Sequence, residues 1–385
     1  MEKTCVFLKY LIRAHLDRCA KSGFTKPMNF TFFGYPKTGK TTLFNILTGS
    51  RIEVKTYENG KKETNQRTCP LPDSRLDRIG EIYSEKKKIF AMVDFVDLAG
   101  ISYGEVKSSA YLSRLRKSDS LIHVVRGFQD DKIPHPRGKI SPNEDITFME
   151  EELVLSDMIS VESRLEKLKK DLTKTKDPEG EKEKEVLERL HPYLEEGKAI
   201  REFLFSPSEE KQVRNFAFLS QKPLLHMINI DEAEIPQIPS IEQNHTPPKK
   251  GTAFLAFCGK IEEEIHEMEN EEEKKAFLSA YGLRSLTADR FFRISFNLLE
   301  VIHFFTIGKD EVRAWAIPKN FTASRAAGVI HSDLETGFIR AEVISWEELL
   351  HIGSFQLAKE KGAIRLEGKD YLVQDGDVIY FRFAP

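Results

Sequence analysis

Short apolar runs alternate with segments of helical periodicity in the first third of the chain and again after residue 220. The runs that we interpret as strands are 29–33, 89–96, 121–125, 223–228 and 252–257. Strands that are buried on both faces read as nearly continuous apolar runs, and the helices between them cover the sheet. The pattern therefore predicts an α/β fold with a mostly parallel sheet.

A segment dense in lysine and glutamate interrupts this pattern over residues 143–213. Apolar residues recur there at helical spacing on both sides of a break at 177–180: Val161, Leu165, Leu168, Leu172, Leu187, Leu190 and Leu194. A narrow apolar seam on each of two helices, with Pro and Gly between them, predicts an antiparallel helical hairpin. The hairpin is either a solvated spacer or an arm that binds a partner.

From about residue 301 onward the apolar positions alternate with polar ones, as in the runs 312–317 and 337–344. This period is typical of half-buried strands. The last strand, 378–383, follows a tight turn at 374–377, where Gly376 readily adopts a positive φ. We therefore predict a small β-rich domain at the C-terminal end.

These patterns divide the chain into an extension (1–27), the first part of the sheet domain (28–142), the helical insert (143–213), the second part of the sheet domain (214–300) and the C-terminal domain (301–385). The extension carries an apolar run at 5–12, and the coherent pattern begins at Met28. Either Met28 is the natural start and residues 1–27 are a misassigned leader, or these residues form an amphipathic anchor or docking helix.

Composition narrows the class of protein. A chain of 385 residues with 40% hydrophobic content can form roughly two or three domains. Its 58 basic and 61 acidic residues nearly cancel to a net charge of -3, so nucleic-acid binding would need a local basic patch. The four cysteines lack Cys-x-x-Cys spacing, and we interpret them as reduced thiols. No apolar run reaches about 18 residues and no signal peptide is present, so we predict a monomeric, cytoplasmic protein without a membrane segment.

The strand 29–33 leads directly into a Gly-x-x-x-x-Gly-Lys-Thr loop at 34–41, and a helix follows at 42–47. This context is the one that a P-loop requires. Gly34 and Gly39 let backbone N–H groups surround phosphates, and Lys40 reaches the terminal phosphates. The Thr41 hydroxyl is expected to ligate Mg²⁺. The loop therefore predicts binding of a magnesium nucleoside triphosphate.

Asp97 begins an Asp-Leu-Ala-Gly motif at the end of the apolar run 92–96 and should support Mg²⁺ through water. Many signalling NTPases place a glutamine after this glycine to orient the attacking water, but here the position is Ile101. Hydrolysis then needs another polar group. His135, in the segment 128–136, is either a catalytic residue on a mobile loop or an ordinary surface histidine. We interpret His123, in the middle of a strand, as structural.

The base pocket should follow the run 223–228, where a guanine-specific protein carries Asn-Lys-x-Asp. Here the residues are Asn229, Ile230, Asp231 and Glu232. The longer Glu232 misplaces the pair of hydrogen bonds that an aspartate makes to guanine, and Ile230 lacks a stacking lysine stem. ATP, or relaxed use of ATP and GTP, is favoured over strict guanine specificity.

Several motifs together resemble one known family: 42–45, 72–76, 95–100 and 229–232, and in the C-terminal part 311–315, 326–333 and 367–371. From about Met28 to Pro385 the chain resembles the YchF/Obg-like ATPases, within the translation-factor class of P-loop GTPases. The resemblance implies a helical insert, a β-grasp-like TGS domain, a preference for ATP, and association with ribosomes or ribosomal RNA. Its implied phosphate-binding residues are Lys37, Thr38, Gly39, Lys40, Thr41 and Thr42. It also implies that Asn229 and Ile230 line the adenine pocket.

Three positions depart from the family pattern. Lys37 replaces an asparagine with which relatives hold potassium, so we predict hydrolysis that does not depend on potassium. The switch threonine falls on Lys61, which cannot ligate Mg²⁺, so either Thr64 replaces it or this switch no longer senses the γ-phosphate. The glycine-rich segment that follows the Asp97 motif is shortened to 101–107.

The leading hypothesis is a slow ATPase that acts as a conformational switch near the ribosome, with the hairpin and the TGS domain as contact surfaces. Four basic residues of the last domain either meet RNA phosphates or are ordinary solubilising charge: Lys359, Lys361, Arg365 and Lys369. The alternatives are a nucleotide-binding regulatory or scaffold protein with little hydrolysis, and a conventional GTPase.

Overall fold

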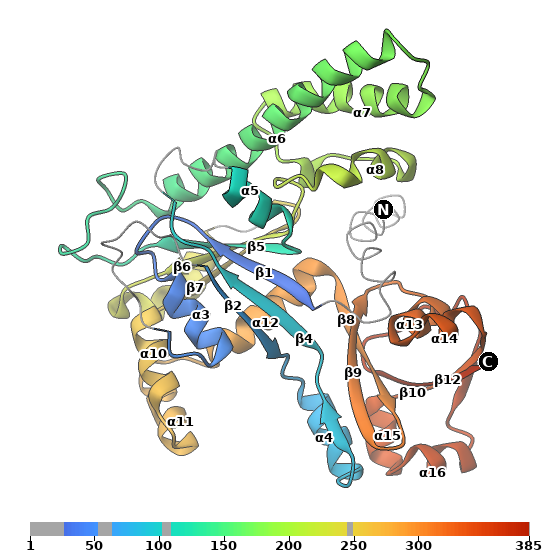
Figure 1. Ribbon diagram of the computed structural model, residues 1–385. Helices are drawn as coiled ribbons and strands as arrows, with labels where there is room; N and C mark the ends of the chain where they lie inside the picture. Colours follow the sequence, from blue (N-terminus) through green and yellow to red (C-terminus); the bar gives the residue numbers. More distant parts are fainter. Residues whose placement is uncertain (1–26, 53–63, 102–108, 245–248, 385) are drawn as a thin grey trace. The chain divides into compact units, whose positions relative to one another are not determined.

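The structure is a computed structural model that describes residues 27–52, 64–101, 109–244 and 249–384 (Figure 1). The described chain forms two compact units. Unit 1 contains Thr68–Val93 and Leu299–Pro385, and unit 2 contains Asn29–Arg67 and Asp94–Leu298. Residues 68–93, which the sequence pattern assigned to the sheet domain, therefore belong to the same unit as the C-terminal part. The proposed leader lies outside the described residues, apart from Pro27.

A six-stranded sheet organises unit 2, in the order β2-β4-β1-β5-β6-β7. Its strands are β1 (Met28–Phe33), β2 (Asn65–Pro70), β4 (Met92–Asp97), β5 (Ser120–Arg126), β6 (Leu224–Asn229) and β7 (Thr252–Phe257). The four strands β1, β5, β6 and β7 run parallel, with Phe32 opposite Ile122 and Ile122 opposite Leu225. The predicted α/β fold with a mostly parallel sheet is confirmed.

The predicted single strand 89–96 is wrong, because the chain forms two strands there. β3 (Lys87–Ile89) pairs in parallel with β9 of the second sheet, and β4 belongs to the first sheet. The apolar run continues through the connection between them, so its pattern hides the change of sheet. β2 was not predicted, because Cys69 is its only buried residue.

Side chains on β1 alternate between two packed layers. Phe30 and Phe32 contact Phe291 of α12 (Thr287–Leu299), and Phe32 also contacts Phe44 of α3 (Lys40–Thr48). Phe33 packs in the opposite layer with Leu115 of α5 (Ser109–Arg116) and with Met149 of α6 (Pro142–Leu172). The period of two along β1 thus fixes which helices cover each face.

The helical insert forms the predicted hairpin. In Figure 1, α6 runs away from the sheet and α7 (Pro178–Glu195) returns beside it. Val161, Leu187 and Leu190 are fully buried in the core between the two helices. Asp177 caps α7 by accepting a hydrogen bond from the Glu179 N–H, so the break at 177–180 is the start of the second helix.

Shorter helices complete unit 2. They are η3 (Ile200–Glu202), α8 (Pro207–Val213), η4 (Arg214–Phe216), η5 (Glu232–Gln237), α9 (Ile238–Gln243), α10 (Gly259–Glu267) and α11 (Glu271–Ala280). Helices α9 and α10 pack with strands β5, β6 and β7 in one apolar cluster that includes Val125, Ile228 and Ile261.

A second six-stranded sheet organises unit 1, in the order β11-β10-β12-β8-β9-β3. Its other strands are β8 (Val301–Ile307), β9 (Glu311–Pro318), β10 (Phe338–Ser345), β11 (Arg365–Glu367) and β12 (Asp377–Phe383). Its helices are α4 (Ser74–Ile82), α13 (Ala323–Ile330), α14 (Ser332–Thr336), α15 (Trp346–Ile352) and α16 (Phe355–Glu360). Phe304 packs in the cluster that contains α13, and the next residue, Phe305, packs with α4, α15 and α16. Helices therefore cover both faces of this sheet.

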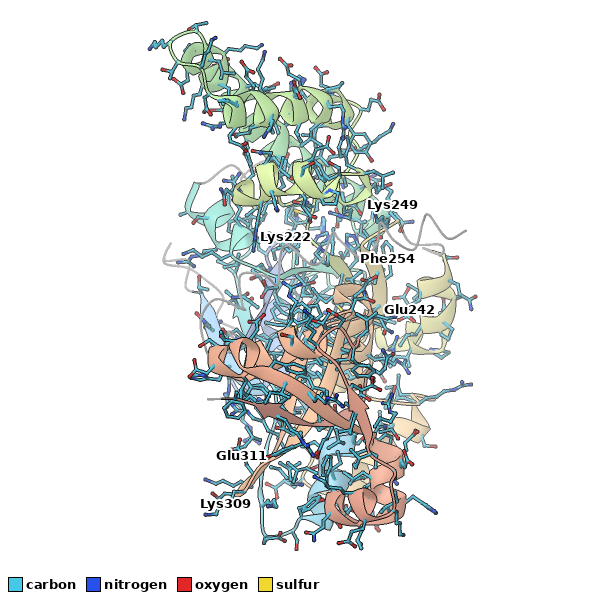
Figure 2. All side chains as sticks on the ribbon, turned by 90° about the vertical axis from the view of Figure 1, so that its right-hand side faces the viewer. Lys222, Glu242, Lys249, Phe254, Lys309 and Glu311 are labelled. Atoms are coloured by element: carbon cyan, nitrogen blue, oxygen red, sulfur yellow. The ribbon has the colours of Figure 1, made fainter. Side chains whose placement is uncertain are left out.

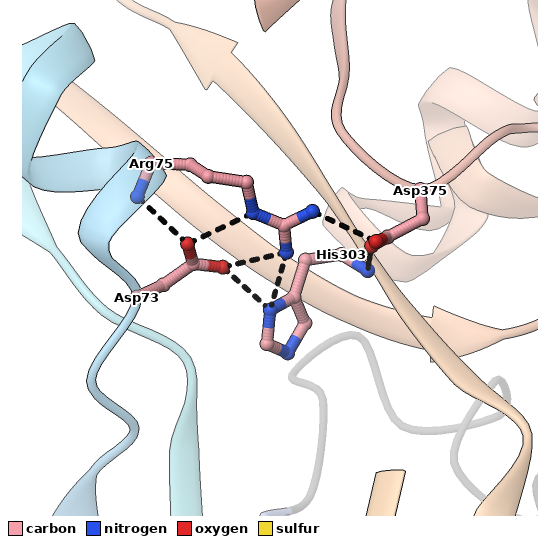
Figure 3. Close-up of polar contacts among 4 residues, drawn as sticks. All are labelled: Asp73, Arg75, His303 and Asp375. Carbon is pink, nitrogen blue, oxygen red and sulfur yellow. Dashed lines mark hydrogen bonds and ion pairs between the residues drawn. The ribbon is translucent and has the colours of Figure 1, made fainter. Parts of the chain in front are cut away.

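A polar network that is buried at Asp73 and His303 and exposed at Asp375 joins the first segment of unit 1 to its C-terminal segment (Figure 3). Asp73 accepts hydrogen bonds from Arg75 Nε and Nη2 at 3.0 and 2.9 Å, and its Oδ2 lies 2.8 Å from His303 Nδ1. Arg75 also donates to Asp375, which lies in the predicted tight turn where Gly376 has a φ of 91°. Burial alone would raise the pKa of Asp73, but hydrogen bonds from His303 and Arg75 hold it below its usual range. The network fixes the turn against β8.

Two further sequence predictions can be compared with the described residues. Cys69 and Cys258 are buried free thiols, as predicted, whereas Cys5 and Cys19 lie outside the described part. Within the described ranges, none of the helices has both the length and the apolarity to cross a membrane.

Candidate functional site

The loop between β1 and α3 turns through backbone conformations that favour glycine. Gly34 has a φ of 132°, and a Cβ atom there would lie 2.7 Å from the Val124 carbonyl oxygen. Gly39 has a φ of 95°, and a Cβ atom there would lie 2.3 Å from Asn229 Nδ2. Lys37, by contrast, adopts a φ of 60° as an exposed lysine. The two glycines of the motif are therefore required by close approach as well as by φ.

The start of α3 has the features of an anion site. Gly39 is its N-cap and supplies no side-chain hydrogen bond, and no acidic residue lies in the first turn, which contains Thr41 and Thr42. The N–H groups of that turn are therefore free for a ligand, and the helix dipole favours an anion there. Lys40 Nζ donates to the Tyr35 carbonyl oxygen at 2.5 Å, and Thr38 Oγ1 donates to the same oxygen at 3.2 Å.

Lys40 is buried, with 6% of its surface exposed. This burial lowers its pKa to about 8, against the opposing effect of the Asp97 carboxylate. The negative charge of a bound phosphate would raise this pKa again and keep the amine protonated.

Asp97, at the end of β4, lies beside Thr41. One carboxylate oxygen, Oδ2, accepts hydrogen bonds from Thr41 Oγ1 at 2.9 Å and from Asn65 Nδ2 at 3.1 Å. The other oxygen, Oδ1, is buried and has no hydrogen-bond partner among the described residues. Burial raises the pKa of Asp97, and Lys40 opposes that rise.

A divalent cation fits this arrangement. A hydroxyl and a buried carboxylate oxygen without a partner are oxygen donors of the kind that Mg²⁺ prefers. Within the described residues, no group of three or more His, Cys, Asp or Glu side chains could hold a metal by itself. The cation would therefore need the phosphate oxygens of a nucleotide as further ligands. Asn65 was not found from the sequence, because it lies at the start of the unrecognised strand β2.

The residues of the predicted base motif have different environments. Asn229 Nδ2 donates to the Thr38 carbonyl oxygen at 3.2 Å, and its Oδ1 accepts from the Gly259 N–H at 2.9 Å. Ile230 is 3% exposed and packs in the core with Ile228 and Ile235, so little of its side chain faces a pocket. Asn229 thus links the phosphate loop to the start of α10.

Glu232 is an exposed carboxylate with two partners. Lys260 Nζ lies 3.1 Å from Oε2, and Tyr281 Oη donates to Oε1 at 2.9 Å. Hydrogen bonds from these two groups lower the pKa of Glu232. The side chain is therefore held by α10 and by the end of α11, two elements that the sequence did not connect to the base motif.

Ile101, in the position after the Asp97 motif, is 2% exposed. It packs with Tyr35 and Leu98 in the core beneath α6, and its N–H donates to the Gly34 carbonyl oxygen at 3.2 Å. Its side chain cannot orient a water molecule. Lys61 and the shortened segment after Ile101 lie outside the described residues. Thr64 is described, but the hydrogen-bond partners of the Asp97 side chain among the described residues are Thr41 and Asn65.

The segment that carries His135 is held by several contacts. The Arg126 guanidinium donates to the carbonyl oxygens of Phe128, Asp130 and Ile133. The His135 side chain is 3% exposed, and its Nε2 lies 3.0 Å from Asp145 Oδ2. The sequence placed His135 on a mobile loop, but in this conformation its ring is buried. Asp145, in the first turn of α6, was not predicted, because no motif in the neighbouring sequence indicates that it contacts His135.

His123 is structural, as the sequence indicated. Its Nδ1 lies 3.1 Å from His226 Nδ1, and His226 Nε2 lies 3.2 Å from Glu150 on α6. Burial lowers the pKa of His123 well below its ordinary value, with a contribution from His226. Lys249, labelled in Figure 2, lies 3.8 Å from the other oxygen of Glu150.

The basic residues that the sequence singled out in unit 1 differ in their partners. Lys359 pairs with Glu342 at 3.1 Å, and Arg365 lies within 3.4 Å of both Glu367 and Asp377. Half of this set is thus neutralised by carboxylates of the same unit.

Known proteins match the chain in both parts. A family model described as 50S ribosome-binding GTPase matches residues 29–172, and a model for the C-terminal domain of YchF GTPases, described as a protein of unknown function, matches residues 301–384. Relatives named ribosome-binding ATPase YchF are 40% identical in Bacillus subtilis and 39% identical in Haemophilus influenzae, over 91% of this chain and 97% of each relative. The solved structure of the Schizosaccharomyces pombe YchF GTPase is similar with a TM-score of 0.77 and 27% identity, over 92% of this chain and 97% of that one. The fold, the glycine loop and these matches together place the chain in the YchF family.

Proposed function

We propose that this protein binds MgATP at the loop 34–41, hydrolyses it slowly and acts as a ribosome-associated conformational switch in the cytoplasm. The observation that carries nucleotide binding is the uncapped start of α3 beside buried Lys40 and the unpaired oxygen of Asp97. The names of the bacterial relatives support ATP as the nucleotide and the ribosome as the partner.

Each residue of the loop has a distinct part in this proposal. The N–H groups of the loop and of the first turn of α3 receive the phosphates, and Lys40 exchanges the Tyr35 carbonyl for the terminal phosphate oxygens. Thr41 turns its hydroxyl oxygen to the cation, which Asp97 holds through water. Bound Mg²⁺ would neutralise charge on the phosphate oxygens.

Slow turnover follows from the environment of Ile101. A glutamine at that position would orient the attacking water, whereas Ile101 is packed in the core. His135 is the candidate for this part, and in the present conformation it faces Asp145. Hydrolysis would therefore require a rearrangement before the chemical step.

Preference for ATP rests on Glu232. Guanine recognition needs a free carboxylate that accepts two N–H groups, but Glu232 already accepts from Lys260 and Tyr281. Binding GTP would displace at least one of these partners. Adenine recognition does not need a free carboxylate at this position.

The packing of Ile101 also favours a second candidate, a nucleotide-binding regulatory or scaffold protein with little hydrolysis. In that case the protein binds nucleotide, and any phosphate release is independent of Asp97.

Calorimetric titration with ATP and with GTP, followed by phosphate release, tests these alternatives. We expect ATP to bind more tightly than GTP, and Lys40→Ala to abolish turnover, whereas Lys117→Ala, which changes an exposed lysine of the same unit, has no effect. Much tighter binding of GTP would indicate a conventional GTPase. If nucleotide binds and any phosphate release is unchanged when Asp97 is replaced by alanine, the regulatory or scaffold protein is favoured. Co-sedimentation with ribosomes, with and without ATP, tests the partner.

A further inference from the structure

His135 is enclosed by groups from three segments of unit 2. Its ring meets the Tyr35 ring of the phosphate loop edge-on, with 5.8 Å between the ring centroids. Its Nδ1 accepts a hydrogen bond from the Arg137 N–H at 3.3 Å, and its Nε2 faces Asp145 Oδ2 at 3.0 Å. Acceptance at Nδ1 assigns the proton of the neutral ring to Nε2, the nitrogen that faces the carboxylate.

The carboxylate on the other side of this contact is equally enclosed. The Asp145 side chain is 2% exposed, and its Oδ1 accepts a hydrogen bond from Arg137 Nη1 at 3.1 Å. The contact of Oδ2 with His135 lacks the alignment of a hydrogen bond, and neither atom has another hydrogen-bond partner among the described residues. The carboxylate attracts the Nε2–H group, and packing holds the two side chains together without the directional hydrogen bond that would lock them.

His135 in this position cannot serve hydrolysis. A group that orients or deprotonates water must lie within hydrogen-bond reach of that water, and Nε2 is closed off by Asp145. The ring nevertheless lies against the phosphate loop. Tyr35, against which the ring lies, carries the carbonyl oxygen that holds Lys40 Nζ.

The chain around His135 can move without unfolding its surroundings. Arg126 fixes the backbone as far as Ile133, and α6 begins at Pro142. Between these points His135 lies between two exposed prolines, and Gly138 adopts a φ of 75° in open space. Separation of His135 from Asp145 therefore needs movement of a short surface segment and rearrangement of the ion pairs that Arg137 and Lys139 make with the first turn of α6.

We propose that Asp145 is a positioning residue that holds His135 in a resting place behind the phosphate loop, so that hydrolysis requires the pair to separate. This inference rests on the proposed function, because His135 has a part in hydrolysis only if the protein turns over nucleotide. Weakening the contact should raise the fraction of molecules in which His135 is free, and with it kcat.

Reaction with diethyl pyrocarbonate, followed by mass spectrometry of the His135 peptide, measures this release without any turnover. His331, whose side chain is 59% exposed, serves as the internal reference. We expect His135 to react slowly in the wild type and several-fold faster in Asp145→Asn and Asp145→Ala. Glu151→Gln, which changes an exposed carboxylate of the same helix α6, should react as the wild type does. Equal rates in all four proteins would overturn the proposal.

Kinetics supply the second test. Asp145→Asn should raise kcat for ATP by about three- to tenfold with the KM unchanged, and the added change His135→Ala should remove the gain. A merely structural role of Asp145 would lower kcat or the melting temperature instead. Faster modification of His135 without a rise in kcat would also overturn the proposal. If the wild type releases no more phosphate than Lys40→Ala, the proposed function fails, and the modification rates still decide whether Asp145 holds His135.

Discussion

At the scale of single residues, Lys37 carries the clearest strain in the phosphate loop. Its φ of 60° lies in the left-handed region, where an L-residue other than glycine or asparagine loses about 1–2 kcal/mol. An asparagine there, as in the family pattern, would tolerate this backbone conformation. The lysine is exposed, so its ammonium group can instead face bound phosphate.

We predict that wild-type hydrolysis does not depend on potassium and that Lys37→Asn makes it do so. The variant should also unfold at a slightly higher temperature, because asparagine relieves the strain at this φ. Phosphate release in KCl and in NaCl of equal ionic strength measures the first effect, and a thermal melt measures the second. A several-fold potassium stimulation of the wild type would contradict the prediction.

Gly39 offers a matched comparison with Gly49. Both glycines have positive φ angles, 95° and 64°, so an alanine at either position should cost about 1 kcal/mol of backbone strain. A Cβ atom at Gly39 would meet Asn229, whereas at Gly49 it would meet nothing within 4 Å. We predict that Gly39→Ala lowers ATP affinity at least tenfold and that Gly49→Ala leaves it unchanged, as measured by calorimetric titration. Equal losses of affinity would mean that backbone strain alone is responsible.

At the scale of elements, the sequence predicted the helices and strands in which a single apolar pattern runs through the whole element. Val161 and Leu187 identify the hairpin because both helices keep a single apolar seam, and Phe30 and Phe33 identify β1 because it is buried on both faces. The pattern could not find the turn between β3 and β4, since an apolar run says nothing about which sheet it joins. The sequence also could not predict the parts of Asp145 and Asn65, because only the fold brings them next to His135 and Asp97.

Helix α6 is attached to the sheet domain through buried carboxylates, of which Asp157 is the deepest. It accepts hydrogen bonds from the N–H groups of Leu219 and Ser220 at 2.9 and 2.7 Å and from the Ser220 hydroxyl. Burial nevertheless raises its pKa to about 6. The folded protein therefore holds this proton at pH values where the unfolded chain, with a pKa of about 3.9, has lost it.

We predict that this group makes unfolding easier as the pH rises from about 4 to 6. The folded state binds more protons than the unfolded state in that window, so the free energy of unfolding falls by about 3 kcal/mol as Asp157 ionises. Asp157→Asn should remove this part of the pH dependence, and Asp171→Asn, at an exposed position of the same helix, should retain it. Thermal melts followed by far-ultraviolet circular dichroism at several pH values measure the difference. A parallel pH profile in the wild type and Asp157→Asn would refute the assignment.

At the scale of the whole molecule, the two compact units can be observed separately. Both tryptophans of the chain, Trp315 and Trp346, belong to unit 1. All residues that we propose to hold nucleotide belong to unit 2. Tryptophan fluorescence therefore reports unfolding of unit 1 only, whereas circular dichroism also detects the helices of unit 2.

We predict that MgATP raises the unfolding temperature of unit 2 more than that of unit 1. A ligand that binds only the folded form stabilises it by about 2.7 kcal/mol at a concentration of 100 Kd, which corresponds to about 5–10 °C for a unit of this size. The shift should appear in circular dichroism, with a smaller one in tryptophan fluorescence, and Lys40→Ala should show neither. Equal shifts in both signals would mean that the two units unfold as one cooperative block, so that nucleotide binding at the loop stabilises the whole chain directly.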